Sequence, residues 1–478
     1  MFILLAFVAG SIACTQIPTT EDQEPSADAS TLELARTNLH RSMEIVSSAR
    51  KNYLTGEDMA LSRFYNPFTG IKSAERGSVW MYTTAIEAVN SILSGMTALK
   101  EAGDPCLYDH HYQAYSKFLS DLVDNLEYYA GTYTLVSYTQ TREWTVYAVN
   151  RSSRKGGANV QGRENVYDDQ EWLAIELLEA YRVTGEERYL EKAEYLISYV
   201  LDGWDCTIGE DGHENGGIVW GPGYYTKHSC SNGPMVAPLV KLAALYEGRN
   251  DQISYRYIGD DGKRLSKDMP KSEYYLMFAR KIYDFQRNHL FKKSNGVYWD
   301  MLGAKGLNGD NICYETVDGV RYRGHNPIQN PIGKEYSYNS GTMLSGAAAL
   351  YGATGEKRYL EELTKLSNDA FRFFAHKSAK YSGMYEYDVT GFNPWFNDVL
   401  LRGWLDISAH YGNVKLNVGT FQKNLDYAWE HHLQDHMLPT NLLAGWNLEK
   451  GKNATEAMFT FAYAAEYGYL AEYYLENK

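Results

Sequence analysis

Two adjacent carboxylates stand at the start of an apolar stretch, in YDDQEWLAIELLEAYRVTG (167–185). Asp168 and Asp169 lie between Tyr167 and Trp172, and the residues that follow are suited to burial in a helix. A single Asp at a helix start is usually a cap, because its side chain accepts hydrogen bonds from free amides and its charge suits the helix dipole. Two in succession beside aromatic rings also predict a reaction that needs a pair of carboxyl groups.

Hydrolysis of a glycosidic bond is such a reaction. One carboxyl group protonates the leaving oxygen, and the other attacks the sugar or activates water. Neighbouring residues at a helix start hold their carboxyl groups about 5 to 6 Å apart, which is close to the separation in retaining, double-displacement enzymes. The Asp that free amides and the helix dipole stabilise would be the ionised nucleophile. The other, crowded by a like charge, would have a raised pKa and act as acid and then as base.

The elements that position these carboxylates are helices of two kinds. Apolar periodicity predicts charged, one-faced helices near 31–55, 107–129, 186–203, 269–290, 356–375 and 416–432. It predicts almost uncharged helices near 77–101, 168–183, 233–247, 340–353, 395–411 and 454–475. A helix that is apolar on every side has to be surrounded by protein, whereas a one-faced helix lies at the surface. The two kinds alternate along the chain as six pairs.

An internal repeat supports a ring built from these pairs. YRVTGEERYLE (181–191) recurs as YGATGEKRYLE (351–361), and in both copies a Gly, Gly185 or Gly355, separates an apolar helix from a charged one. The spacing corresponds to three helical hairpins, which is half of a ring. The predicted fold is therefore all-α: an (α/α)6 toroid of six helical hairpins, with inner apolar and outer amphipathic helices, in a single domain at 31–478.

The long segments before the inner helices supply candidate sugar contacts. All six inner helices would start at the same end of the ring, so these segments, rich in Gly, Trp, Tyr, Asn and Asp, converge on one mouth. Trp and Tyr rings suit sugar rings, although buried packing is an equal alternative for Trp220 and Tyr224. Asn232 and Asn339 either cap the next helix or bond sugar hydroxyls. Trp446 precedes the last helix and is a further candidate.

Composition narrows the classes of partner. The formal net charge is -14, which argues against nucleic acid and anionic membrane surfaces. The 41 Tyr and 10 Trp residues fit sugar binding but fit a Tyr-rich core equally well. The chain lacks HExxH, P-loop and GxGxxG-before-strand motifs, so neither a metal nor a nucleotide cofactor is expected.

The N-terminus predicts export. MFILLAFVAGSIAC (1–14) is too short to span a bilayer, reads as a secretion signal and resembles a bacterial lipoprotein signal with Cys14 as the lipidated residue. The polar, acidic residues 15–30 fit a flexible linker. We therefore expect a protein anchored by lipid to the bacterial outer membrane, on its cell surface or periplasmic face. The other cysteines, Cys106, Cys206, Cys230 and Cys313, allow two disulfides in three connectivities.

Three segments carry a resemblance to a known family. The stretch 167–205, with its adjacent Asp pair, resembles glycoside hydrolase family 76, the α-1,6-mannanases. GGIVWGPGYYTKHSCSNGP (216–234) and YSYNSGTMLSGA (336–347) are similar to two further segments of that family. The resemblance runs over most of 60–470. It implies an (α/α)6 toroid, no cofactor, and a retaining endo-mannanase that acts on α-mannan or manno-oligosaccharides, which we expect to be monomeric.

By position, the resemblance implies Asp168 as nucleophile and Asp169 as acid/base. Trp299 and Asp300 match a family position near the substrate, and Ser340 stands where Gln is usual. A long insertion separates Asp300 from Tyr336. Both departures lie at the predicted mouth, where they bear on substrate and chain length.

Two other functions fit parts of the pattern. Unsaturated glucuronyl hydrolases and sugar epimerases share the ring, but uronate enzymes need cations for a carboxylate and epimerases depend on mouth histidines. A non-catalytic glycan-binding lipoprotein would explain the anchor, linker and aromatic residues. It leaves the Asp pair unexplained.

Overall fold

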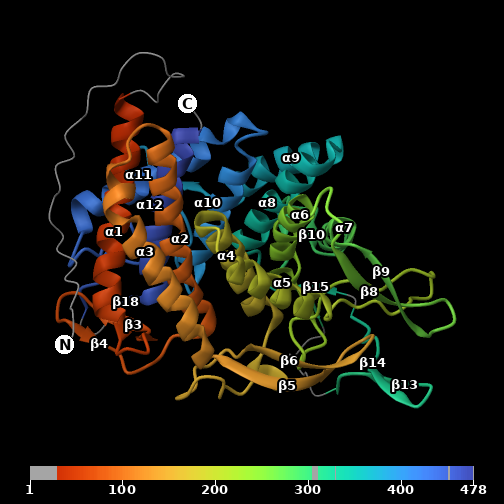
Figure 1. Cartoon of the computed structure of the whole chain (residues 1–478). Helices are drawn as coiled ribbons and strands as arrows, with labels where there is room; N and C mark the ends of the chain where they lie inside the picture. Colours follow the sequence, from red (N-terminus) through yellow and green to blue (C-terminus); the bar gives the residue numbers. More distant parts are fainter. Residues whose placement is uncertain (1–28, 304–310, 329, 450–452, 477–478) are drawn as a thin grey trace. The chain divides into compact units, whose positions relative to one another are not determined.

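The computed structural model describes residues 29–303, 311–328, 330–449 and 453–476 (Figure 1). The predicted signal peptide, Cys14 and residues 15–28 of the predicted linker lie outside these residues. Over the described ranges, none of the helices has both the length and the apolarity that a membrane crossing requires. Those ranges contain twelve α-helices, α1 to α12, and they divide into two compact units. The prediction of one domain over 31–478 stays a prediction.

The first unit takes in residues up to 77, 84–124 and 421 onward. Its helices are α1 (Ala29–Tyr53), most of α2 (Val79–Glu101), α3 (Cys106–Asn125), most of α11 (Lys415–His432) and α12 (Ala457–Glu476). Its strands are β1 (Leu54–Thr55), β2 (Ala60–Leu61), β3 (Phe64–Asn66), β4 (Ile71–Lys72) and β18 (Thr455–Glu456). The helix α12 packs along α1. It also approaches α2 closely at Gly468, where an added Cβ would stand 2.4 Å from Ser91 Oγ.

The second unit, residues 78–83 and 125–420, carries the predicted Asp pair. Its helices are α4 (Tyr167–Thr184), α5 (Glu187–Leu201), α6 (Val236–Leu245), α7 (Lys271–His289), α8 (Ser337–Thr354), α9 (Lys357–Phe374) and α10 (Asn393–Ile407). The apolar helices α6, α8 and α10 form its centre, and each of α4, α6 and α8 packs against the charged helix that follows it. These helices follow the ranges predicted from periodicity.

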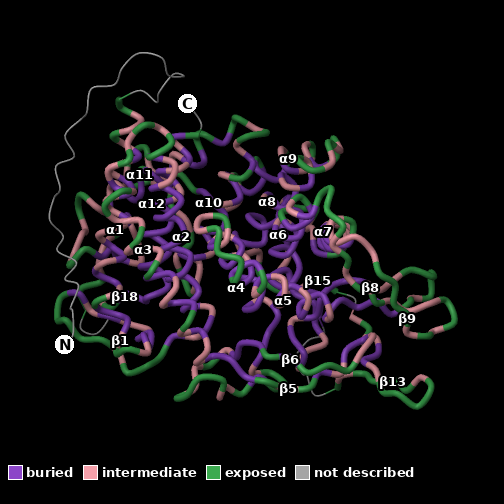
Figure 2. The backbone as a smooth tube through the Cα atoms, viewed as in Figure 1, coloured by how far each residue is buried: buried purple, intermediate pink, exposed green. Residues whose placement is uncertain are grey.

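Burial separates the two kinds of helix as expected. The first three turns of α8 are almost wholly buried because its residues there are small or apolar (Figure 2). The charged helix α5 buries Tyr189, Leu190, Ala193 and Ile197, which lie on one face, and exposes Glu191 on the other. One boundary differs: the helix predicted to end near 129 ends at Asn125, where a 3-10 turn leads into a strand.

The two copies of the internal repeat form the same helix end. Gly185 and Gly355 have φ angles of 72° and 68°, and their N–H groups bond the carbonyls of Tyr181 and Tyr351. Only glycine adopts this left-handed conformation without strain. The structural interpretation of both glycines is confirmed.

Small residues bring α8 and α10 into direct backbone contact. A Cβ added at Gly341 would stand 2.4 Å from the carbonyl oxygen of Val399, and one at Gly403 would stand 2.5 Å from that of Gly341. No side chain fits between these backbones. The two helices therefore pack at a distance that only glycine permits.

Beta hairpins form a feature that the periodicity analysis missed. The long ones pair β5 (Ala130–Val136) with β6 (Thr141–Tyr147), β8 (Gln252–Ile258) with β9 (Arg264–Pro270), and β13 (Tyr314–Val317) with β14 (Val320–Arg323). They lie together in Figure 1, joined by hydrogen bonds of Arg264 Nε to Tyr138 O at 3.1 Å and of Arg323 N to Ser137 O at 2.9 Å. We call these three pairs the hairpin group.

Shorter strands close the loops near the inner helix starts. A three-stranded sheet orders β15 (Asn330–Ile332), β12 (Met301–Gly303) and β7 (Lys227–His228), all antiparallel. The remaining pairs are β10 (Phe291–Lys292) with β11 (Val297–Tyr298), and β16 (His376–Lys377) with β17 (Tyr385–Glu386). The sheet brings both ends of the predicted insertion beside the segment that precedes α6.

Three of the cysteines are free thiols. Cys206 and Cys230 are buried and Cys313 is exposed. Two disulfides among the four downstream cysteines, which the sequence allows, are therefore not formed, since at most one of these four is left to pair.

Candidate active site

The Asp pair lies inside the first turn of α4 and does not occupy the capping position. Val166 is the N-cap residue and has no side-chain oxygen to offer the free amides. The N–H of Tyr167 donates instead to the carbonyl oxygen of Trp220 at 2.8 Å. Asp168 and Asp169 thus follow at the second and third helical positions, and Asp169 is only 6% exposed.

Burial and local donors act on Asp168 in opposite directions. Burial raises its pKa, while the Cys230 thiol, the Trp220 indole and the main-chain N–H groups of Asp168 and Asp169 lower it; the net result is a pKa of about 6. Among the described residues, neither Asp168 Oδ1 nor Trp220 Nε1 makes a hydrogen bond of ordinary geometry. Both atoms are buried polar groups in need of a partner.

Asp169 lacks these compensating donors. Burial and the negative charge of Asp168 raise its pKa well above the ordinary value. When two like charges sit this close, one group stays protonated after the other has ionised. Near neutral pH the arrangement is an ionised Asp168 next to a protonated Asp169.

Two further carboxyl groups surround the pair. Burial and the charge of Asp168 raise the pKa of Asp300 to about 6. Glu171, one turn along α4, is fully buried; burial and Asp168 raise its pKa well above normal, and its two oxygens have no hydrogen-bond partner in the described part of the chain. The site therefore gathers four carboxyl groups whose pKa values are all raised above their ordinary range.

An aromatic wall stands next to Asp168. The rings of Trp220 and Tyr224 lie 4.4 Å apart, and the His228 ring stacks against Trp220 at 4.4 Å with an interplanar angle of 14°. Burial lowers the pKa of His228 to about 3, so this ring is neutral and supports Trp220. Trp220 and Tyr224 remain partly exposed, as a sugar-stacking surface requires.

Asn232 has a different role from the sugar contact expected. It is fully buried, its Oδ1 accepts from Ile218 N at 2.8 Å, and its Nδ2 donates to Ile218 O at 3.0 Å and His228 O at 2.7 Å. Its amide is engaged with the main chain. Asn232 therefore holds the segment that leads to Trp220.

The other predicted contacts of this unit gather around Trp299. Its carbonyl oxygen accepts from Ser229 Oγ and, at 3.4 Å, from Asn339 Nδ2, while Lys292 lies 3.8 Å above its ring. Asn339 Oδ1 and Ser340 Oγ are buried, and no hydrogen bond to either is found within the described ranges. Both residues lie inside α8, so neither is its cap.

Trp446 belongs to the other compact unit. There its indole N–H donates to His432 O at 2.6 Å and its ring meets Phe68 edge-on at 5.5 Å. The prediction that Trp446 contacts sugar stays a prediction.

Cys230 and Tyr338 were missed by sequence reasoning. Both are buried, Cys230 lies near Asp168, and Tyr338 lies near Cys230. Their only sequence signal is position, since each sits in a quoted segment beside a candidate, Asn232 or Asn339. Over the described residues, no group of His, Cys, Asp and Glu side chains is arranged to hold a metal ion.

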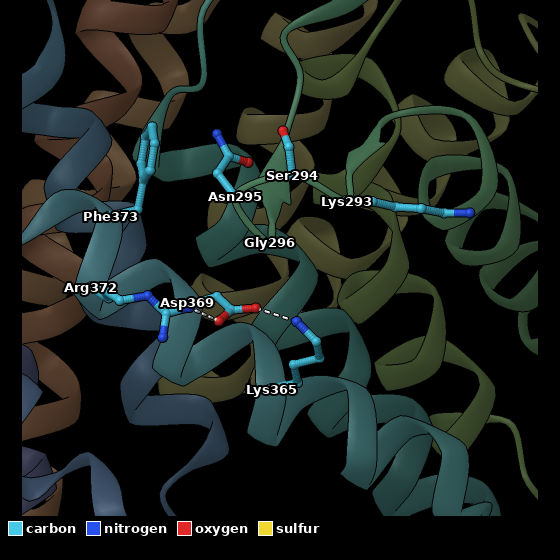
Figure 3. A pocket seen from close by; sticks show the side chains of 8 residues that line it. All are labelled: Lys293, Ser294, Asn295, Gly296, Lys365, Asp369, Arg372 and Phe373. Carbon is cyan, nitrogen blue, oxygen red and sulfur yellow. Dashed lines mark hydrogen bonds and ion pairs between the residues drawn. The ribbon is translucent and has the colours of Figure 1, made fainter.

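A separate pocket of about 330 Å³ lies between the turn after β10 and helix α9. Figure 3 shows Lys365 and Arg372 pointing toward Asp369, which pairs with both. Gly296 lies directly against this carboxylate: a Cβ added to Gly296 would stand 2.1 Å from Asp369 Oδ2. The pocket contains none of the predicted site residues, and its buried carboxylate is neutralised by its neighbours.

Comparison with known families gives an extended match. The model of glycosyl hydrolase family 76 matches residues 83–255 and 262–411. A mannan endo-1,6-alpha-mannosidase from Candida albicans is 26% identical over 210 residues, which are 44% of this chain and 37% of that protein. The match thus spans little more than a third of the curated relative.

Solved structures match over nearly the whole chain. A family 76 glycoside hydrolase (mannosidase) from Bacteroides thetaiotaomicron has a TM-score of 0.64 at 21% identity, covering 93% of this chain and 100% of that one. An inactive variant of an α-1,6-mannanase from Salegentibacter, with two consecutive Asp residues changed to Asn and α-1,6-mannotriose bound, has a TM-score of 0.57 at 18% identity and covers 92% and 99%. At this identity the likeness shows the fold, and it confirms the (α/α)6 toroid predicted from the six helix pairs.

Proposed function

This chain belongs to glycosyl hydrolase family 76, and from that premise we propose that it is a retaining endo-α-1,6-mannanase. Its substrate is the α-1,6-linked mannan backbone, and its products are shorter manno-oligosaccharides. The observation that carries the proposal is the adjacent pair Asp168 and Asp169 in the first turn of α4, with Asp169 buried and Trp220 beside Asp168. The pKa of Asp168 is about 6, and that of Asp169 lies well above its ordinary value.

In the first step, Asp168 acts as nucleophile. A carboxylate oxygen of Asp168 attacks the anomeric carbon, while Asp169 gives its proton to the glycosidic oxygen. The bond between that carbon and oxygen breaks, the shortened chain leaves as an alcohol, and a mannosyl ester of Asp168 remains. The charge of Asp168 is consumed as that of Asp169 appears, so the pair never carries two full charges.

In the second step, Asp169 acts as base. Its carboxylate takes a proton from water, the water oxygen attacks the anomeric carbon, and the ester bond to Asp168 breaks. Two displacements on opposite faces of the sugar return the α configuration. Asp168 is again ionised and Asp169 again protonated, so the cycle closes without a cofactor.

Unpartnered polar atoms around the pair support sugar binding. Trp220 Nε1, Asn339 Oδ1 and Ser340 Oγ are buried, and in the described part of the chain they lack hydrogen bonds. Sugar hydroxyls both donate and accept, so a bound mannose would satisfy donors and acceptors alike. The partly exposed rings of Trp220 and Tyr224 add a stacking face.

The relatives point to the same substrate. The Salegentibacter enzyme is described as an α-1,6-mannanase, and its inactive variant carries two consecutive Asp-to-Asn changes and binds α-1,6-mannotriose. Asp168 and Asp169 are the adjacent pair in the matched part of this chain.

The test uses linear α-1,6-mannan. We expect oligosaccharides of intermediate length to appear before mannose, and proton NMR in the first minutes to show the α anomer of the new reducing end. The double variant Asp168→Asn with Asp169→Asn is the control and should release nothing. Mannose as the sole early product would indicate exo action, and early β anomer would overturn the double displacement. No release by the wild type would reject the activity itself.

We further propose that Cys14 carries a lipid that anchors a monomeric enzyme to the bacterial outer membrane. The support is the N-terminal apolar stretch and the acidic linker that follows it. A Cys14→Ala variant should move from the membrane fraction to the soluble fraction or stay as precursor. A wild type that is fully soluble, with its N-terminus cut elsewhere, would reject this.

A further inference from the structure

The insertion between Asp300 and Tyr336 delivers one arginine to the active site's aromatic wall. Its two ends form β12 and β15, its middle forms the β13–β14 hairpin, and Arg323 is the last residue of β14. The N–H of Arg323 donates to Ser137 O at 2.9 Å, which joins the insertion to the hairpin group. The insertion is thus built into the fold at this position.

The surroundings of Arg323 are unusual for a charged side chain. It is 3% exposed, and among the described residues no carboxylate pairs with it. Its Nη1 donates to Pro222 O at 3.2 Å, and its Nη2 donates to Tyr224 O. A buried charge is costly unless it is compensated. Here two carbonyl dipoles of one loop bond the Nη atoms and the Tyr138 ring lies 5.4 Å away, while Nε has no hydrogen-bond partner among the described residues. Arg suits this place because its planar guanidinium presents two N–H groups in fixed directions, whereas the donors of a Lys ammonium are not fixed relative to one another.

The loop that Arg323 holds, residues 220–225, is pressed against the entry to α4. A Cβ at Gly221 would stand 2.7 Å from Asn165 O, and one at Gly223 would stand 2.5 Å from the carbonyl carbon of Gly162. The carbonyl of Trp220 accepts the N–H of Tyr167, the residue before Asp168. Any displacement of this loop therefore moves both the Trp220 ring and the start of α4.

A second contact from the insertion fixes the segment before this loop. His325 Nδ1 lies 2.7 Å from Asp205 Oδ2, and Asp205 is ion-paired at 2.8 Å with the buried Lys227. Lys227 also donates to Gly216 O at the turn that begins the segment leading to Trp220. The insertion thus reaches this part of the site at two points, two residues apart in the chain.

We propose that Arg323 is a positioning residue for catalysis: it clamps the loop 220–225 so that Trp220 faces Asp168 and the first turn of α4 stays in register. The proposal rests on the proposed function for its kinetic part. It assigns the insertion a role in productive sugar binding, and it makes Arg323 act through Trp220 and Tyr167, without touching substrate.

The experiment compares Arg323→Met with Arg264→Met. Arg264 is the matched control, because it also anchors the hairpin group, through Tyr138 O and Glu315, but forms no hydrogen bond or ion pair with the loop 220–225. On α-1,6-mannotetraose, Arg323→Met should raise KM about tenfold and lower kcat less, because the lost alignment weakens sugar binding first. Arg264→Met should leave both within about twofold. Arg323→Lys, which keeps the charge but not the planar fork, should fall between.

A readout independent of activity separates this proposal from the proposed function. Amide hydrogen exchange of Tyr167 reports its bond to Trp220 O, and that of Gly185, at the other end of α4, reports the helix itself. Arg323→Met should speed exchange at Tyr167 at least tenfold and leave Gly185 unchanged. Equal effects at both amides, or a Tyr167 amide as protected as in the wild type, would overturn the clamp even in an active enzyme. Faster exchange at Tyr167 alone in a chain that does not cleave mannan would uphold the clamp and reject the mannanase.

Discussion

Asp168 Oδ1 and Trp220 Nε1 are both buried, and the described residues supply neither atom with a hydrogen bond of ordinary geometry. The two side chains are close enough for Trp220 to lower the pKa of Asp168. A donor and an acceptor left unsatisfied side by side are costly without a ligand. Trp220 is therefore an electrostatic neighbour of Asp168 as well as a partly exposed aromatic face.

Changing Trp220 to Phe should therefore shift the pH dependence of the reaction. The nucleophile must be ionised, so kcat/KM should fall as the pH drops below about 6, the pKa of Asp168. Phe keeps a flat ring but removes the N–H that lowers this pKa. The pKa of Asp168 should rise in Trp220→Phe, and the acidic limb of the kcat/KM profile should move to higher pH.

Tyr224→Phe is the control for this shift, because Tyr224 packs on Trp220 and is not among the groups that lower the pKa of Asp168. Its acidic limb should stay where it is in the wild type. An unchanged limb in Trp220→Phe would show that the indole N–H does not act on the carboxylate.

Separate Asn variants of the two aspartates should lose activity in different ways. Asp168→Asn has no nucleophile and should lose at least about a hundredfold in kcat on every substrate. Asp169→Asn should lose a similar factor on mannan but retain turnover of an aryl mannoside, whose leaving group needs no proton. Azide should accelerate that variant, since it attacks the mannosyl ester without a base. Equal behaviour of the two variants would remove the distinction in role.

The helices were predictable because each one satisfies a local rule. Gly185 and Gly355 end helices in the left-handed conformation that only glycine takes easily, and both appear in the repeat. The apolar helix α8 is buried because it has no charged residue. The hairpin group was missed although β8 alternates polar and apolar residues. Its partner β9 is mostly polar and exposed, so the pairing has no apolar pattern on that strand to announce it.

The candidate site was predictable in its carboxylates but only in part around them. Because Asp168 and Asp169 are neighbours in the sequence, they lie in one turn of α4. Asn232 looks like a sugar ligand by residue type, yet its amide bonds the main chain of Ile218, fourteen residues away. No sequence pattern marked Arg323 as a site residue, because its contacts with the loop 220–225 depend on how the insertion folds back. Long-range contacts of this kind are absent from local patterns.

Asp168→Asn should stabilise the folded protein near neutral pH. The folded pKa of about 6 lies above the ordinary Asp value of 3.8, so the folded state binds more protons than the unfolded chain between these values. The free energy of unfolding therefore falls as the pH rises through this window, and the loss is complete above about 6. The variant, which has no such charge, should be more stable by about 1 to 3 kcal/mol at pH 7.5.

The difference should shrink as the pH approaches 4, where the folded wild type carries a protonated Asp168. Thermal unfolding of both proteins at pH 4 to 8 measures it. A stability gap that is constant with pH would show that the ionisation of Asp168 has no cost in the fold.

The contact between α8 and α10 predicts opposite effects for the same substitution on one helix. Gly341→Ala should destabilise the protein by about 2 kcal/mol or more, because the new methyl group would stand 2.4 Å from Val399 O and the two backbones would have to separate. Gly352→Ala, near the end of the same helix, meets nothing closer than His410 Nε2 at 3.8 Å. There the better helix propensity of alanine should stabilise by up to about 1 kcal/mol. Urea unfolding of the two variants should give midpoints on either side of the wild type. If Gly341→Ala were as stable as Gly352→Ala, the two helices would be free to move apart, and the close contact would not fix the position of α8 against Trp299.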